Sequence, residues 1–185
     1  MTDYPLDHFI SDLEFVVAAA QSEDELLEGV ASLAERFAAT PDWLAPAHYQ
    51  CDEALGYGEV LLYQAPGGGL NVWTGAWSPG GSVPPHDHGT WAVVAGMVGK
   101  ERNVLWQRLD DGAQPDRAEL EAGEAQVIGP GDVLTMPSDA IHSVSNEGDE
   151  VSLSLHVYGA DLTDRNRHQY DPEAGTATPI GRALE

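Results

Sequence analysis

The sequence has 185 residues, 42% of them hydrophobic, which is enough for one domain with a substantial apolar core. Its 31 acidic residues outnumber 8 basic ones, and the formal net charge at pH 7 is −23. Nucleic acids and anionic lipid surfaces are bound through Lys and Arg side chains, so neither partner is expected. The acidity is typical of a solvated surface, either in a high-salt host or on an ordinary acidic protein.

The lone cysteine, Cys51, excludes an intramolecular disulfide and a thiolate cluster. The N-terminal stretch "MTDYPLDHFISDLEF" has no basic segment followed by an apolar one, and no apolar run is long enough to span a membrane. We therefore expect a soluble cytoplasmic protein.

Residues 1–46 predict a helical segment packed on the main domain. A second helix within it begins at Ser22, where Glu25 three residues later forms a capping-box pattern. Pro41 and Pro46 flank the exit of this helix. The apolar residues of the first helix recur at the three-and-four spacing of one helix face: Leu6, Phe9, Ile10, Leu13, Val16 and Val17.

Residues 47–170 have a different sequence pattern, in which short runs rich in Val, Leu, Trp and Tyr are separated by Gly, Pro and Asp. Strands at this spacing predict an all-β sandwich or barrel. Residues 171–185 are predicted to be a short, polar C-terminal tail. The runs predicted as strands are "EVLLYQ", "LNVWTGAW", "TWAVVAG", "RNVLWQRL", "AQVIG", "DVLTMP", "IHSVSN" and "EVSLSLHVYG".

Two histidines, His86 and His88, lie two positions apart in "SVPPHDHGTWAVVAG". In an extended segment such residues point to the same side, which suits chelation of iron, zinc, copper or nickel. The alternative is a pair of polar residues on a loop. A metal would need a third ligand, and His142 in "GPGDVLTMPSDAIHSVSN" is the candidate because it begins an apolar strand.

The stretches 81–99 and 131–146 together resemble the two halves of the cupin signature. The resemblance implies a mainly β fold, the cupin double-stranded β-helix or jelly-roll barrel, preceded here by N-terminal α-helices. It also implies a metal bound by His86, His88 and His142. Two positions depart from the pattern: Asp139 replaces a glycine, and no glutamate follows the second histidine.

Without that glutamate, the ligands would be three neutral imidazoles, and a divalent ion would keep its full charge and favour an anionic ligand such as a thiolate. This set resembles that of the thiol dioxygenases, the cupin branch of cysteine dioxygenase and 3-mercaptopropionate dioxygenase. Ser154, His156 and Tyr158 in "SLSLHVYG" resemble the outer-sphere relay of that branch. The alternative is a half-buried strand whose polar residues happen to alternate. Val93 stands where animal-type enzymes carry a cross-linked cysteine.

The resemblance implies iron(II) as the cofactor, with zinc, nickel and manganese as alternatives, and oxidation of a small thiol by O2 to the sulfinate. Glu59 occupies the place of the carboxylate-binding arginine of cysteine dioxygenases. Either Arg165 or Arg167 then binds a substrate carboxylate, or Glu59 faces an amine such as that of cysteamine. Ordinary surface arginines are the alternative.

The expected partners are a small thiol and O2 rather than nucleic acid or membrane, and the expected state is a monomer or small homo-oligomer. Two other functions stay open: a three-histidine cupin metalloenzyme of different chemistry, and a small-molecule-binding cupin without catalysis. The remaining histidines are predicted to be surface or packing residues: His8, His48 and His168. The residues predicted to belong to the barrel core are Trp73, Trp77, Trp91 and Met136, any of which could line an apolar pocket.

Overall fold

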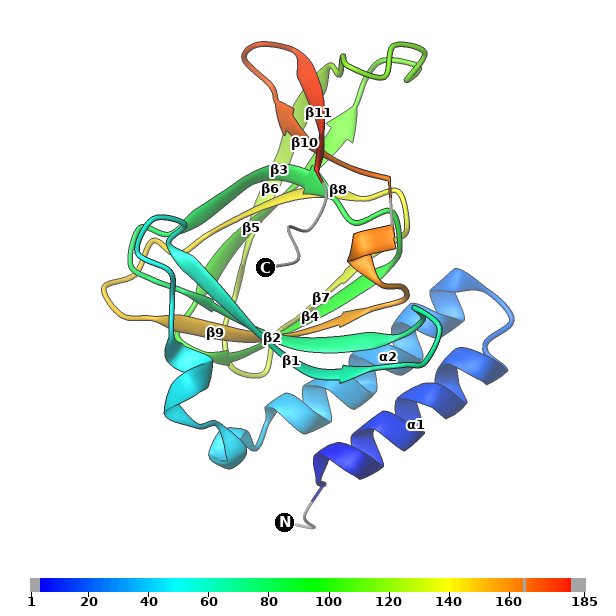
Figure 1. The fold of residues 1–185 in the computed structure, drawn as a ribbon, viewed down its shortest axis with the longest axis vertical. Helices are drawn as coiled ribbons and strands as arrows, with labels where there is room; N and C mark the ends of the chain where they lie inside the picture. Colours follow the sequence, from blue (N-terminus) through cyan, green and yellow to red (C-terminus); the bar gives the residue numbers. More distant parts are fainter. Residues whose placement is uncertain (1–3, 165, 181–185) are drawn as a thin grey trace.

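The computed structural model describes residues 4–164 and 166–180 and shows a mainly β protein of two antiparallel sheets with two α-helices (Figure 1). The mainly β prediction is therefore confirmed. In the five-stranded sheet the strand order is β1-β2-β9-β4-β7. Its strands are β1 (Tyr57–Gln64), β2 (Asn71–Trp77), β9 (Ser152–Tyr158), β4 (Ala92–Val98) and β7 (Val133–Met136).

The six-stranded sheet has the order β11-β10-β3-β8-β5-β6. All eight runs predicted as strands fall on strands of the two sheets. β2, β4 and β9 are buried along nearly their whole length, whereas β6 is almost wholly exposed. The strands of this sheet are β11 (Thr176–Ile180), β10 (Arg167–Asp171), β3 (Ser82–Asp87), β8 (Ile141–Ser145), β5 (Glu101–Arg108) and β6 (Leu120–Ile128).

The helices α1 (Leu6–Ala19) and α2 (Glu23–Ala38) cover the outer face of the five-stranded sheet, and α2 contacts β4, β7 and β9 (Figure 1). Their apolar faces join the largest core cluster, in which the rings of Phe9 and Phe37 stack with centroids 4.4 Å apart. Within the described residues, short 3₁₀ helices lie in the connections: η1 (Pro41–Trp43), η2 (Pro46–Tyr49) and η3 (Leu162–Asp164).

The predicted capping box of α2 forms in part. Ser22 Oγ accepts a hydrogen bond from the Glu25 backbone N–H at 3.2 Å, as predicted. The Glu25 carboxylate accepts instead from the backbone N–H of Gln21 at 3.0 Å. The start of the second helix is therefore where the sequence places it, with the return hydrogen bond shifted by one residue.

The C-terminal segment differs from the prediction of a polar tail from residue 171 onward. β11 pairs with β10 from Arg167↔Ile180 to Asp171↔Thr176, so the sheet continues to residue 180. Tyr170 and Ala177 are buried in a small apolar cluster, while the other face of this edge hairpin stays polar. One buried face on a short edge strand gives too weak an apolar signal to distinguish it from a tail. Residues 181–185 lie outside the described residues.

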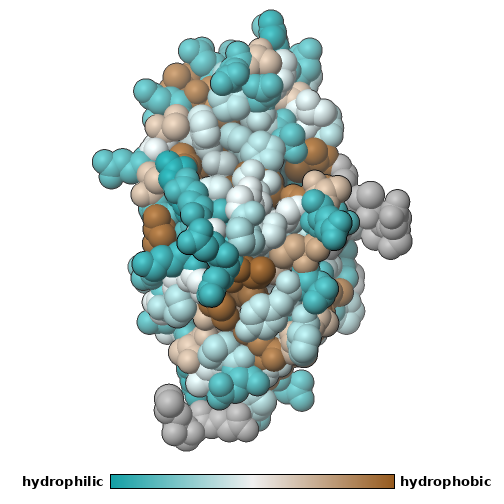
Figure 2. All heavy atoms as spheres, turned by 90° about the vertical axis from the view of Figure 1, so that its left-hand side faces the viewer, coloured by the Kyte–Doolittle hydropathy of each residue, from teal (hydrophilic) through white to brown (hydrophobic). Residues whose placement is uncertain are grey.

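Most of the acidic side chains lie at the surface. Figure 2 shows a largely hydrophilic face on which apolar side chains form only separate patches. No helix within residues 4–164 and 166–180 combines the length and apolar character needed to cross a bilayer.

Candidate metal centre

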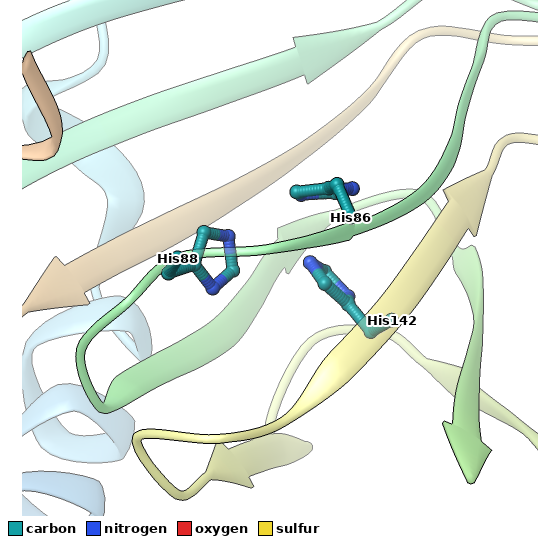
Figure 3. Close-up of side chains that lie close together, drawn as sticks. All are labelled: His86, His88 and His142. Carbon is teal, nitrogen blue, oxygen red and sulfur yellow. The ribbon is translucent and has the colours of Figure 1, made fainter. Parts of the chain in front are cut away.

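Three buried histidines converge between the two sheets. His86 lies near the end of β3, His88 follows it by two residues, and His142 is on the neighbouring strand β8 directly opposite His86. One nitrogen from each ring lies within 4.8 Å of the others, and Figure 3 shows the three side chains close together. Strand pairing thus brings together the two motifs that lie more than fifty residues apart in the sequence.

Two of the three rings are fixed by hydrogen bonds from their Nδ1 side. His86 Nδ1 lies 2.9 Å from the carbonyl oxygen of Pro84, and His142 Nδ1 lies 3.2 Å from Oδ1 of Asn103. Both oxygens can only accept, so each Nδ1 carries the proton and each Nε2 keeps its lone pair. This is how protein metal sites orient histidine ligands.

The residues present fit a metal ion. His142 Nε2 is buried and has no hydrogen-bond partner among the described residues. Such an unsatisfied buried acceptor costs about 1–3 kcal/mol unless a ligand compensates it. The lone pair lies within the histidine cluster, so an ion bound there would supply the missing interaction.

Electrostatics keep the three imidazoles neutral. Burial is the main cause that lowers the pKa of His86, His88 and His142, and mutual repulsion among the charged forms lowers the pKa of His88 and His142 further. Neutral imidazole is the form that binds metals. In the described part of the chain, this cluster contains no carboxylate or thiol, so a divalent ion would keep its double charge.

A hydrogen-bonded chain runs along β9 beside the cluster. Ser154 Oγ and His156 Nε2 lie 2.8 Å apart, and His156 Nδ1 and the Tyr158 hydroxyl lie 2.9 Å apart. All three side chains are buried, and the Tyr158 ring centroid is 4.9 Å from that of His88. Burial lowers the pKa of His156 to about 4, so this ring is neutral at pH 7.

A cavity of about 580 Å³ opens onto both groups and is lined by the three clustered histidines, His156 and Tyr158. Arg167 and Glu59 line the same cavity, so two of the three predicted substrate-binding residues lie beside the candidate centre. Arg167 Nε donates to the Leu162 carbonyl at 3.1 Å, and its positive charge contributes to the lowered pKa of His86 and His88. Arg165 lies outside the described residues.

Asp87, between the two paired histidines, contacts β10 rather than joining the cluster. Its carboxylate accepts hydrogen bonds from the Tyr170 hydroxyl at 2.5 Å and from the backbone N–H of His168 at 3.2 Å. The His168 ring also lies 3.4 Å from this carboxylate. His168, predicted to be a surface or packing residue, therefore helps tie the ligand-bearing end of β3 to β10.

Trp77, predicted to belong to the core, also lines the cavity, whereas Met136 and Trp91 are buried in the core clusters. Trp73, also predicted to belong to the core, packs against a core cluster. Of the histidines predicted as surface or packing residues, His8 is exposed and His48 is half-buried in η2.

Three further residues of the site are not identified by motif spacing. Asn103 holds His142, and Glu101 contacts the relay serine. Gly75 on β2 lies opposite Ser154 and leaves room for the His156 ring. A sequence signal did exist for Glu101 and Asn103, because polar residues two apart in a strand share one face, and both are buried.

No protein-family model matches the sequence. Among solved structures the chain is similar to oxalate oxidase in complex with glycolate, with 20% identity, 60% of this chain and 56% of that chain covered, and a TM-score of 0.47. It thus spans little more than half the length of that protein. KdgF from Halomonas sp. is similar at 16% identity, with 65% of this chain and 94% of that chain covered and a TM-score of 0.47.

A cupin superfamily protein from Desulfitobacterium hafniense is similar at 17% identity, with 57% of this chain and 78% of that chain covered and a TM-score of 0.42. At such identities and TM-scores, the likeness carries no conclusion about the chemistry of this chain. What the structure defines is a mainly β protein of two antiparallel sheets with a buried three-histidine group that could bind a metal.

Proposed function

We propose that this chain is a cupin-type thiol dioxygenase, with its sheets closed as a jelly-roll barrel, that converts a small thiol and O2 to the sulfinate. His86, His88 and His142 would hold iron(II). The observation that supports this most directly is the hydrogen-bonded chain of Ser154, His156 and Tyr158 beside a carboxylate-free histidine cluster. A barrel that only binds a small molecule needs no such relay next to its metal.

Iron(II), when bound, would supply the Lewis acidity that favours a thiolate and the redox chemistry with O2. The protein would supply a site whose ligands are all neutral, so that an anionic sulfur is attracted by the undiminished charge. The hydrogen bonds from Nδ1 of His86 and His142 would keep both rings oriented while substrate binds and product leaves.

Tyr158 would act at the cavity wall. Its hydroxyl is held at 2.9 Å by His156, which Ser154 holds in turn at 2.8 Å, so the phenol oxygen has a fixed position before substrate enters. A fixed hydroxyl in a buried site stabilises charge at little reorganisation cost. We assign it to hydrogen bonding with the substrate or with oxygen.

The substrate would be a small thiol that also carries charge. Arg167 and Glu59 line one cavity, so a carboxylate could pair with the guanidinium and an ammonium group with Glu59. An amino acid thiol such as cysteine would use both residues, 3-mercaptopropionate would use Arg167, and cysteamine would use Glu59.

The test is to load the purified protein anaerobically with iron(II), add a panel of these three thiols, and measure oxygen uptake and sulfinate. We expect uptake with at least one thiol and a stoichiometric sulfinate product. Tyr158→Phe should lower turnover at unchanged iron content, and His88→Ala should lose iron. No uptake with any thiol by the iron-loaded protein would overturn the proposal.

A further inference from the structure

The relay on β9 does not end at its serine. Ser154 Oγ, already hydrogen-bonded to His156, donates to Oε2 of Glu101 at 3.1 Å. Glu101 begins β5, in the opposite sheet, and its side chain is buried with 3% of the residue exposed. Besides Ser154, the polar side-chain groups of Asn103 and Trp77 interact with this carboxyl group. Removing a carboxylate from water is costly, so the ionised form of Glu101 depends on these contacts.

Glu101, Ser154, His156 and Tyr158 form a chain of three consecutive hydrogen bonds. A serine hydroxyl has one proton, and a neutral imidazole has one N–H. Each internal member therefore donates in one direction and accepts from the other. The direction chosen at one end fixes the direction at every other link.

Consider the chain with Glu101 ionised. The carboxylate can only accept, so Ser154 donates to it and accepts from the Nε2–H of His156. Nδ1 of His156 then carries the lone pair and accepts the phenol proton of Tyr158. The phenol oxygen consequently faces the cavity as an acceptor.

Consider next the chain with Glu101 protonated. The carboxyl group can donate to Ser154, the serine donates to Nε2 of His156, and Nδ1–H donates to the oxygen of Tyr158. The phenol proton is then free to point into the cavity. No heavy atom has to move, because each of the three distances suits either direction.

We propose that Glu101 is a positioning residue that sets the direction of this hydrogen-bond chain and so decides whether Tyr158 offers the cavity a donor or an acceptor. The consequence for turnover rests on the function proposed above. The direction of the chain itself does not depend on which reaction the site performs.

Both forms of Glu101 are accessible near neutral pH. Burial raises the pKa of Glu101 to about 7, against the smaller opposing effect of the hydroxyl of Ser154 and the polar groups of Asn103 and Trp77. His156 stays neutral because burial lowers its pKa to about 4. Over this pH range Glu101, at one end of the hydrogen-bond chain, gains or loses a proton, while His156 in its middle stays neutral.

The strands packed around Glu101 bring few other titratable groups toward it. β9 contributes His156, and β8 contributes His142, which contacts the neighbouring amide rather than Glu101. β2 and β4 contain no titratable residue, and β6 places Ile128 opposite Glu101. Arg102, the residue that follows Glu101 in the sequence, forms an ion pair with the exposed Glu147 at 3.6 Å.

The test uses nitrogen NMR of ¹⁵N-histidine-labelled, zinc-loaded protein, since zinc suits a three-histidine site and is diamagnetic. The shifts of Nδ1 and Nε2 show which nitrogen of His156 is protonated. We expect the Nδ1–H form at about pH 5.5 and the Nε2–H form at about pH 8.5, with a midpoint near the pKa of Glu101. Glu101→Gln should abolish this pH-dependent change.

Ser154→Ala provides a second variant that leaves Glu101 in place and breaks the chain, so it should also abolish the change. Ser152→Ala is the matched control, because Ser152 is buried on the same strand face and its hydroxyl has no partner among the described residues. It should keep the wild-type midpoint. A single tautomer throughout the pH range in the wild-type protein, or a change that persists in Glu101→Gln or Ser154→Ala, would overturn the proposal. Neither result involves thiol or O2, so this test is separate from that of the proposed function.

Discussion

Gly75 on β2 allows the relay histidine to occupy its position. A Cβ added at Gly75 would lie 2.8 Å from His156 Nε2 and 3.2 Å from Cδ2. An ordinary contact between such atoms is about 3.5 Å, so Gly75→Ala requires the ring to move by roughly half an ångström. The nitrogen that would be displaced is the one that binds Ser154 at 2.8 Å.

The expected effect has two parts. Overpacking a buried site costs about 1–3 kcal/mol of unfolding free energy. Displacing Nε2 lengthens its hydrogen bond with Ser154 toward the limit at which such bonds weaken. It also shifts Nδ1 of the same ring, which holds the Tyr158 hydroxyl. Since a misplacement of about 1 Å can cost a factor of 10², we expect Gly75→Ala to lose roughly 10-fold to 100-fold in turnover.

Three measurements check this: thiol turnover, chemical unfolding, and iron content. Iron content should be unchanged, because none of the nearest atoms to the added Cβ belongs to His86, His88 or His142. Gly69→Ala is the matched control, since its Cβ would meet only Ala65 Cβ at 3.8 Å. Wild-type turnover in folded Gly75→Ala protein would refute the argument that His156 must stay where it is.

Three further predictions concern other groups of the site. Asn103→Ala removes the acceptor that orients His142 and should weaken zinc affinity about 10-fold to 100-fold in a competition titration; unchanged affinity would contradict this. Arg167→Met should raise KM for 3-mercaptopropionate at least about 10-fold and leave cysteamine unaffected, and equal changes for both thiols would remove Arg167 from carboxylate binding. Between pH 4.5 and about 7 native Glu101 keeps a proton that the unfolded chain has released, so its contribution lowers the unfolding free energy by up to roughly 3 kcal/mol as pH rises. Glu101→Gln should lack this contribution in urea unfolding, and parallel pH curves for both proteins would contradict it.

Local patterns in the sequence predict much of the fold and part of the site. Short runs rich in Val, Leu, Trp and Tyr between turn residues place the strands, and positions two apart on one strand place Ser154, His156 and Tyr158 on one face. The pair His86 and His88 follows the same rule. These features depend only on neighbours along the chain, which is why they can be read without a structure.

Contacts between distant strands are the part that could not be predicted. Asn103 and His142 are 39 positions apart, and Glu101 and Ser154 are 53 apart. Their pairing depends on strand order and register, which no local pattern fixes. The hairpin of β10 and β11 was missed for a related reason: its buried residues meet Ala118 and Ile141 from other parts of the chain.

The buried carboxylate of Glu101 lies outside the histidine cluster, so the proposed metal site has no acidic ligand even though an acidic group lies nearby. A glutamate among the ligands would cancel one of the two charges of a divalent ion and weaken its attraction for an anionic sulfur. Glu101 instead lies behind Ser154, outside the histidine cluster, and three consecutive hydrogen bonds link it to Tyr158. An ionised Glu101 therefore changes what Tyr158 offers a ligand without joining the histidine cluster.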